Sequence, residues 1–513
     1  MKINRYMKSY KYLILAIGLS IIGCSDLEEE PVGLLAPEGF FQSTQDIQTA
    51  VNGTYGHMLH EDFWGRKMSL TLMLRSDMVA IGDPTTSGRR IEHDEFNVPA
   101  DNGMISGYWN RTYQIIAAAN NAIAGAELVN DTDENKNPVV AQAYFVRAFT
   151  YFHLVRQFGE IPYLSEPVTD VVAANSINKT SVDDVYANII ADLEFAEEWL
   201  PDTQPARSLP AKSAAQSYLA LVYLTRGEHQ LAYNYAFDVI DNEGIYNLDL
   251  DPDFQNLFNA DVVDGSLEPI FSLDFNGFSP SDDGRDYMAA LTGIRGDEQY
   301  EPNVTGGGWS VGVPSLAVYN DWDDNDYRKE VSFDDTNVVN DVVNPFTTFA
   351  NFNSRAVNRP HIAKYTRFTG ETGNGNGRNS NHNYHFMRYA EVLLIAAEAL
   401  NEVSGGSGEA MGYVNRVRAR ARAGNGSAFP ADVSGLNQDD LRDVIIDERR
   451  LELAFEFKRW YDIARLRNGS EVFGPSGYEG LVPGFDPAQD YLLPLPADEI
   501  SRNPNLLPQN PGY

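Results

Sequence analysis

The residues best placed to do chemistry lie near the C-terminus, in the stretch ERRLELAFEFKRWYDIARLR at 448–467. Glu448, Glu452 and Glu456 recur every four residues, so a helix here would carry them in one row. Glycoside hydrolases use paired carboxylates, which makes the row a candidate catalytic set. The row is interleaved with basic residues: Arg449, Arg450, Arg459 and Arg465. Because catalytic carboxylates must flank a substrate in a cleft, we interpret the row as structural, pairing with neighbouring helices, and Trp460 as core.

Two close histidine pairs are the other candidate ligands: His57 with His60, and His382 with His385. A zinc site needs three or four converging ligands, and neither pair has a matching cysteine or an HExxH context. The acidic stretch DWDDND at 321–326 resembles a calcium loop. It lacks the glycine at position six and the glutamate at position twelve of an EF-hand. We expect no cofactor, although an irregular structural calcium site stays open.

The elements that position these residues are mostly helical from about residue 44 to 245. Residues 137–158 place Ala141, Phe145, Ala148, Phe152 and Val155 at three- and four-residue spacing, which predicts a helix with one buried face. Gly159 and Pro162 should end it.

Residues 211–242 predict two helices that are broken at 226–228. Leu219, Ala220 and Tyr223, followed by Gly227 and Ala232, resemble the tetratricopeptide pattern. Small residues let two helices approach closely, with the tyrosine between them.

Residues 246–385 are rich in Gly, Asn, Asp and Pro, which predicts loops, turns and short strands such as the one at 269–273. Loops this long are usually functional. Helices are predicted again at 386–402, 408–423 and 439–467, before a loop-like tail.

Cys24 is the only cysteine in the 513 residues. Basic residues and then the apolar run at 12–22 precede it, which is typical of a secretory signal peptide. The run is too short for a membrane span. Because Ile21, Ile22 and Gly23 lead into the cysteine, the boundary resembles a bacterial lipobox. We expect a signal peptide at 1–23, lipidation of Cys24, and an acidic tether at 24–43.

The formal net charge is −34, and removing residues 1–23 takes away four positive charges and no acid. A protein this acidic is a poor nucleic-acid binder, since such binding depends on Lys and Arg that neutralise phosphates. No convincing P-loop, dinucleotide fingerprint or serine nucleophile elbow is present.

Several separated motifs together resemble the SusD/RagB family of outer-membrane lipoproteins. They are AYFVRAFTYFHLVRQFGEIPY at 143–163, the helix pair after Ala214, RYAEVLLIAAEAL at 388–400, YVNRVRARARAG at 413–424, ERRLELAFEFKRWYDIARL at 448–466 and the closing LLPLPADEI…NP…QNPGY. One departure is the extra Arg-Ala step in RARARAG. The resemblance covers nearly the whole chain after the lipobox.

The resemblance implies a mainly α fold: a tetratricopeptide-like scaffold of helical pairs that carries a loop-rich, irregular ligand-binding face. We expect one domain over 44–513, with a helical part at 44–245, a loop-rich part at 246–385 and a helical part with a tail at 386–513. The resemblance also implies a non-catalytic lipoprotein in the outer membrane, facing the cell exterior. It would bind oligo- or polysaccharide and pass it to a SusC-like TonB-dependent transporter. Asp326 and Arg328 would be an Asp-x-Arg pair that pins a loop.

Sugar rings stack on flat aromatic side chains, and their hydroxyls pair with planar polar groups. Tyrosine and tryptophan suit this role because each has an apolar body and a polar tip. Loop aromatics are the better candidates, because helix aromatics usually face the core. The predicted platforms are Trp309, Tyr300, Tyr287, Phe96 and Trp64, and the predicted polar partners are Arg89, Arg90, Asn303 and Asp283.

Two other functions stay open on the sequence alone. A surface glycoside hydrolase would release products from a polysaccharide. A purely structural scaffold would use its repeat-like helices to bind protein and would recognise no sugar.

Overall fold

The computed structural model describes residues 37–277, 284–297, 308–370, 380–477, 480 and 482–513. The N-terminal part is helical, as predicted, apart from one short strand. Its elements are α2 (Pro37–Phe40), α3 (Thr44–Met58), α4 (Lys67–Leu74), β1 (Val79–Ile81), α5 (Gly88–Asp94), α6 (Gly103–Ala126), α7 (Asp133–Phe158), α8 (Val171–Ala174), α9 (Val182–Trp199), α10 (Lys212–Arg226), α11 (His229–Asp241) and α12 (Glu243–Tyr246).

The middle part consists of short strands and short helices joined by loops. Its elements are β2 (Pro269–Asp274), α13 (Met288–Thr292), β3 (Gly312–Pro314), α14 (Leu316–Asp321), α15 (Tyr327–Ser332), β4 (Phe333–Asp334), β5 (Thr336–Val339), β6 (Val342–Pro345), β7 (His361–Ile362) and β8 (Asn383–Arg388), with 3₁₀ helices at Phe254–Phe258, Val263–Gly265 and Phe346–Asn351. The described strands form two-stranded antiparallel sheets: β1 with β3, β2 with β8, β4 with β7, and β5 with β6. The prediction of loops and short strands is confirmed.

The C-terminal part returns to helices and ends in an irregular tail. Its elements are α16 (Tyr389–Ser404), α17 (Gly408–Ala423), α18 (Gln438–Glu452), α19 (Arg459–Leu466), α20 (Gly469–Val472) and α21 (Ala497–Arg502), with a 3₁₀ helix at Pro504–Leu506. The fold class is therefore mainly α, as predicted.

The helix α7 buries the predicted stripe from Ala141 to Val155 and ends at Gly159, whose φ of 69° suits glycine. The pair α10 and α11 turns at Gly227, which is left-handed with a φ of 75°. Ala220 and Ala232 are fully buried between the paired helices, and the ring of Tyr223 stacks on that of Tyr235 at 5.6 Å. The predicted repeat-like pair is confirmed.

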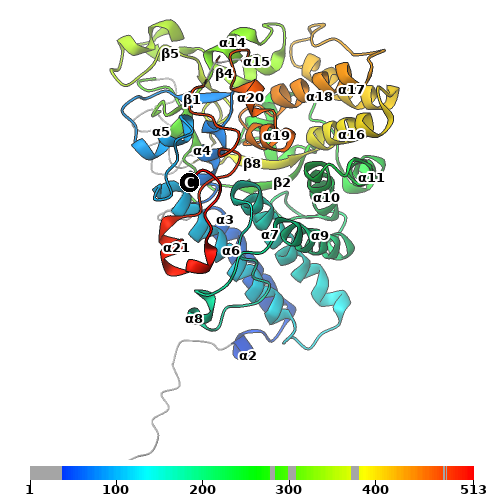
Figure 1. Cartoon of the computed structure of the whole chain (residues 1–513). Coiled ribbons are helices and arrows are strands. Elements are labelled where there is room, and N and C mark those ends of the chain that lie inside the picture. Colours follow the sequence, from blue (N-terminus) through cyan, green and yellow to red (C-terminus); the bar gives the residue numbers. More distant parts are fainter. Residues whose placement is uncertain (1–36, 278–283, 298–307, 371–379, 478–479, 481) are drawn as a thin grey trace, which may run out of the picture.

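Figure 1 shows α9, α10, α11 and α16 stacked along one flank, with consecutive members packed against each other. The short elements β1, α5, β4 and β5 lie on the other side of the molecule. One large apolar cluster contains residues from all three parts of the chain. The helical stack is thus the framework from which the loop-rich side projects.

Two predicted helices differ from the structure. Residues 386–388 belong to β8, which pairs with β2, so α16 begins only at Tyr389. The predicted helix at 439–467 is split into α18 and α19 by a turn at 453–458, where Phe455 and Phe457 take left-handed φ values of 64° and 65°. Their buried rings hold this unfavourable backbone in place.

Candidate functional site

The loop-rich side presents Trp309 beside β3. Its backbone N–H donates to the carbonyl oxygen of Ala290 in α13, and its own carbonyl accepts from Nη2 of Arg295 at 2.7 Å. The indole is only partly buried against the core, and its ring centroid lies 6.2 Å from that of Tyr287. Trp309 is thus held at both backbone polar groups while part of its side chain reaches solvent.

Asp83, just after β1, holds the segment that carries Trp309. Its backbone N–H donates to Ser310, the neighbour of Trp309. Its buried carboxylate pairs with Arg295 at 3.2 Å and with Arg355 at 2.5 Å. Burial alone would raise the pKa of Asp83, but the hydrogen bonds from Arg355 and Thr85 hold it below its ordinary value. We call Asp83, Arg295, Arg355, Tyr287 and Trp309 the Trp309 cluster.

A second set of arginines lies within electrostatic reach of this cluster. Burial, followed by the charges of Arg66 and Arg89, lowers the pKa of Arg90 to about 10. Arg90 donates to Thr86 at 3.0 Å, and the carbonyl of Arg89 accepts from Asn102. The predicted polar partners Arg89 and Arg90 therefore stand near Arg66, while the acids Asp83 and Glu61 partly offset these charges. Their contact with sugar stays a prediction.

Three predicted platforms prove to be packed inside. Trp64 is 1% exposed in an aromatic cluster, with its ring 4.2 Å from that of Phe386. Phe96 is 5% exposed and packs against Phe473 at 4.8 Å. Tyr287 is 3% exposed, and the guanidinium of Arg66 covers its ring at 4.6 Å. The prediction that these rings offer a free face to sugar is wrong, because the core or an arginine covers them.

Other predicted residues, namely Cys24, Tyr300, Asn303 and Asp283, lie outside the described residues. Trp309 is therefore the predicted platform that the structure leaves partly open.

A groove of about 890 Å³, which sequence reasoning missed, runs beside Phe96. Asn97, Arg359, Asp486 and Gln489 line it, and these planar polar side chains suit sugar hydroxyls. Ala80 of β1 belongs to its wall, and β1 pairs with β3 next to the Trp309 cluster. No local sequence signal indicated the groove, because its walls come from segments almost 400 residues apart.

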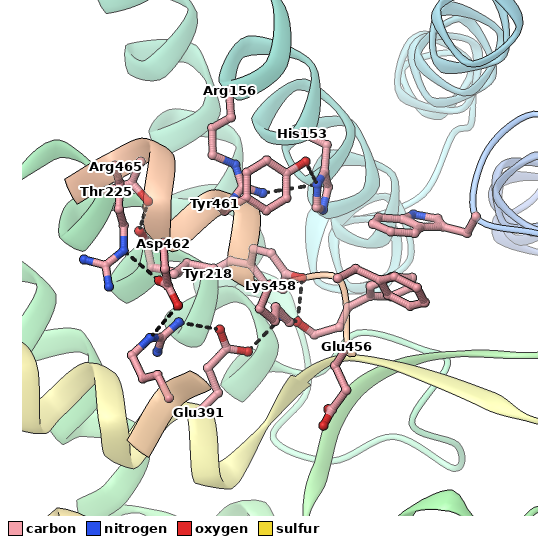
Figure 2. A pocket seen from close by; sticks show the side chains of 15 residues that line it. His153, Arg156, Tyr218, Thr225, Glu391, Glu456, Lys458, Tyr461, Asp462 and Arg465 are labelled. Atoms are coloured by element: carbon pink, nitrogen blue, oxygen red, sulfur yellow. Dashed lines mark hydrogen bonds and ion pairs between the residues drawn. The ribbon is translucent and has the colours of Figure 1, made fainter. Parts of the chain in front are cut away.

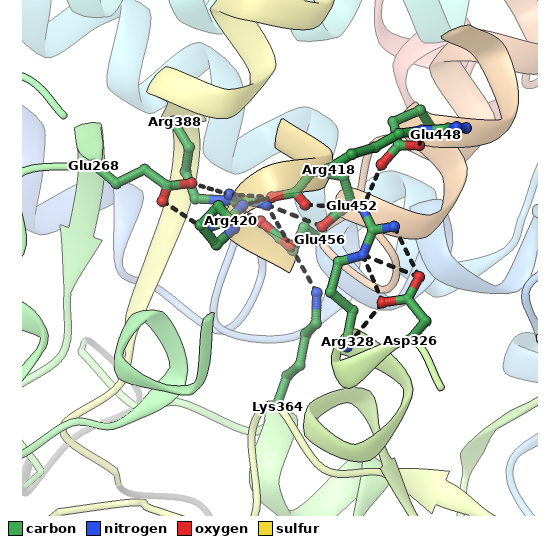
Figure 3. A network of polar contacts seen from close by, with 10 residues as sticks. All are labelled: Glu268, Asp326, Arg328, Lys364, Arg388, Arg418, Arg420, Glu448, Glu452 and Glu456. Atoms are coloured by element: carbon green, nitrogen blue, oxygen red, sulfur yellow. Dashed lines mark hydrogen bonds and ion pairs between the residues drawn. The ribbon is translucent and has the colours of Figure 1, made fainter. Parts of the chain in front are cut away.

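The glutamate row is locked into a buried ion-pair network (Figure 3). Glu448 accepts from Arg328 at 2.6 Å and from Arg418 at 2.7 Å. Glu456 lies past the end of α18 and accepts from Arg388 and Lys364, each at 2.8 Å. Burial lowers the pKa of Lys364 to about 8 although Glu456 opposes this shift.

Glu452 faces Arg328, Arg388 and Arg420 in the same network. The structural interpretation of the row is confirmed, although only two of the three glutamates lie in the helix. Trp460 is fully buried, as predicted.

The interleaved arginines also form ion pairs. Arg449 reaches Glu391 and Asp462, Arg459 reaches Asp77, and Arg465 takes Glu398 with two nitrogens. Figure 2 shows several of these groups around a small internal cavity of about 20 Å³, near the space that one water molecule occupies. This cavity is too small for a sugar.

The other candidate ligands have structural roles. Asp326 binds Arg328 at 2.8 Å, which confirms the predicted Asp-x-Arg pair. His385 contacts Ser272 and the carbonyl of Leu257, and burial lowers its pKa to about 4. Across the described ranges, no three His, Cys, Asp or Glu side chains gather as a metal site would require. In the same ranges, no helix has the length and apolar character to cross a membrane.

Comparison with known proteins shows which family the chain resembles. Residues 336–513 match the model of the SusD family, and residues 38–224 match a SusD-like model described as starch-binding associating with outer membrane. SusD-like protein P2 of Formosa agariphila is 57% identical over 99% of this chain and 100% of its own length.

Solved structures share the fold at low identity. A SusD homolog from Bacteroides thetaiotaomicron is 20% identical with a TM-score of 0.80, covering 93% of this chain and 98% of its own. The surface glycan-binding protein A of the same species, in complex with laminarihexaose, is 21% identical with a TM-score of 0.74, covering 91% and 99%. With the full-length match to the Formosa protein, the family is established: the chain belongs to the SusD family.

Proposed function

We propose that this protein is a surface lipoprotein that captures oligo- or polysaccharide at its loop-rich side and delivers it to a SusC-like TonB-dependent transporter. Residues 1–23 direct export, Cys24 carries the lipid, and residues 24–43 tether the binding domain. The lipid holds the protein to the outer membrane, facing the cell exterior. The lipobox-like boundary at Cys24 and the family's outer-membrane description support this placement.

The observation that carries the proposal is the Trp309 cluster. A partly open indole fixed by backbone hydrogen bonds stands beside the buried carboxylate of Asp83, which pairs with the partly buried Arg295 and the exposed Arg355. Such a platform is preorganised, so a sugar ring can stack on it without the entropic cost of ordering a flexible side chain. The groove beside Phe96 adds a polar-lined surface whose wall includes Ala80 of β1, the strand that pairs with β3.

The protein binds without cleaving. Glu448, Glu452 and Glu456 were the best catalytic candidates. All three are buried, and each forms an ion pair with an arginine. A glycosidase needs one carboxyl group that stays protonated and a second that faces it across the substrate. Glu452 is instead held ionised, since Arg420 and Arg388 keep its pKa well below its usual range against the effect of burial.

Affinity electrophoresis of the soluble chain that starts after Cys24 tests the proposal. The gel panel holds laminarin, xylan, mannan and an anionic polysaccharide, with laminarin included because one structural neighbour is described as a laminarin-binding SusD-like protein. Retardation by at least one polysaccharide is expected. Unretarded migration on every gel would contradict glycan capture by the isolated protein.

A further inference from the structure

A second groove, of about 250 Å³, lies in the helical framework and shares no lining residue with the Trp309 cluster. The C-terminal ends of α7 and α10, the start of α9, and α19 form its walls, together with residues 491–492. Its polar and aromatic lining is Arg156, Tyr186, Thr225, Tyr461, Arg465, Arg467 and Tyr491. We call it the arginine groove. Among its described lining residues there is no Asp or Glu, although the chain carries a net charge of −34.

Two of these arginines have no carboxylate partner among the described residues. Arg156 donates Nε to the carbonyl of Phe152 and contacts Nδ1 of His153 through Nη2. Its guanidinium lies 3.5 Å from the ring centroid of Tyr461 (Figure 2) and 3.7 Å from that of Phe152. Arg467 is exposed and covers the ring of Tyr491 at 4.5 Å. Rings and neutral groups thus hold both cations in place and leave their charge available to an anion.

The third arginine is different. Arg465 binds Glu398 through two nitrogens and Asp462 through Nε. Because these carboxylates balance its charge, Arg465 lines the groove but is not expected to bind an anion. The groove therefore offers two guanidinium charges without an ion-pair partner among the described residues. The rings of Tyr461 and Tyr491 support these guanidiniums, and Arg226 covers the ring of Tyr186 at 4.9 Å. Guanidinium groups recognise carboxylate and sulfate-like oxygens through paired N–H donors.

We propose that the arginine groove binds one anionic sugar residue, with the carboxylate or sulfate group held by Arg156 and Arg467. At about 250 Å³ the groove is smaller than the roughly 300–1,000 Å³ of pockets for drug-sized ligands, so it takes a single ring, not a chain. The inference rests on the proposed glycan-binding function. It adds a charge-selective subsite apart from Trp309.

Ligand-detected NMR on the soluble chain tests this with methyl glucuronide, glucose 6-sulfate and neutral methyl glucoside. We expect both anionic sugars to bind more tightly than the neutral one, and rising salt to weaken them. Arg467→Gln should weaken the anionic sugars about tenfold, the loss expected for one charge-assisted hydrogen bond. Arg156→Lys keeps the positive charge but loses the paired N–H donors of the guanidinium. It should therefore weaken binding of the anionic sugars as well.

Controls separate this inference from the proposed function. Arg502→Gln removes an exposed arginine that is paired with Asp498 and Glu499, and should change nothing. Trp309→Ala should leave the anionic monosaccharides bound while it weakens polysaccharide capture. Equal binding of neutral and anionic sugars, or unchanged binding in Arg467→Gln, would overturn the arginine groove alone. Binding of a peptide with a free C-terminal carboxylate, without binding of the sugars, would reassign the groove to a protein partner and overturn the inference.

Discussion

Replacing Glu452 with glutamine tests whether the glutamate row is structural. In the network, five carboxylates (Glu268, Asp326, Glu448, Glu452 and Glu456) meet five cations (Arg328, Lys364, Arg388, Arg418 and Arg420). The substitution keeps the shape of the side chain and removes one negative charge. The network, which is buried apart from part of Arg418, is then left with one uncompensated positive charge.

Removing one partner of a buried ion pair costs about 3–5 kcal/mol. Because Glu452 faces three arginines, we expect a loss toward the upper end of this range. The assay is urea unfolding, followed as a shift in the midpoint at constant slope. Asp439→Asn on the same helix is the matched control, since Asp439 is largely exposed and its pairing with Arg442 should contribute little.

Unfolding of Glu452→Gln at the wild-type midpoint would contradict a structural role for the glutamate row. So would cleavage of a polysaccharide by the wild-type protein that the variant loses without losing stability. Either result would place the row at a reacting centre and not inside the framework.

Three further predictions concern single residues. Trp64→Ala should destabilise the fold by about 3–5 kcal/mol in urea unfolding, because it empties a fully packed aromatic site; a loss below about 1 kcal/mol would contradict the core assignment. The folded pKa of His385, about 4, is depressed below the unfolded value of about 6.5, so the unfolded state binds more protons and stability falls as pH drops from 6.5 to 4, by up to about 3 kcal/mol for this group. His385→Gln should therefore reduce proton uptake on unfolding at pH 5 by about one, measured from the buffer dependence of the calorimetric enthalpy, and an unchanged uptake would count against the shift. Cys24→Ser should abolish lipid attachment, so the protein should leave the membrane fraction and lose the mass of the lipid; membrane retention would disprove Cys24 as the anchor.

Helices with a local apolar period could be predicted from the sequence. The buried stripe from Ala141 to Val155 and the turn at Gly227 could be predicted, because apolar spacing and a glycine determine local structure within a few residues. The strand at 386–388 was not readable, since its pairing with β2 depends on residues more than 100 positions away. The break at Phe455 and Phe457 carried no glycine or proline, and tertiary packing of the rings forces it.

The candidate site shows the same limit. Trp64 and Trp309 both stand next to a glycine, and the sequence alone does not show whether either side chain is buried. Trp64 belongs to the core, whereas Trp309 is partly open. Tertiary packing distinguishes them, because rings such as those of Phe386 and Phe457 surround Trp64. The two grooves could not be predicted from the sequence, because the walls of each come from segments hundreds of residues apart.

The central claim is glycan capture without cleavage, with Trp309 as a platform. Its most direct test is calorimetric titration of the soluble protein and of Trp309→Ala with the polysaccharide that retards it, followed by product analysis of the same mixtures. We predict saturable binding, a loss of affinity of about tenfold or more (about 1.4 kcal/mol) in the variant, and no shortened products. Released oligosaccharides, or equal affinity of both proteins, would contradict the account.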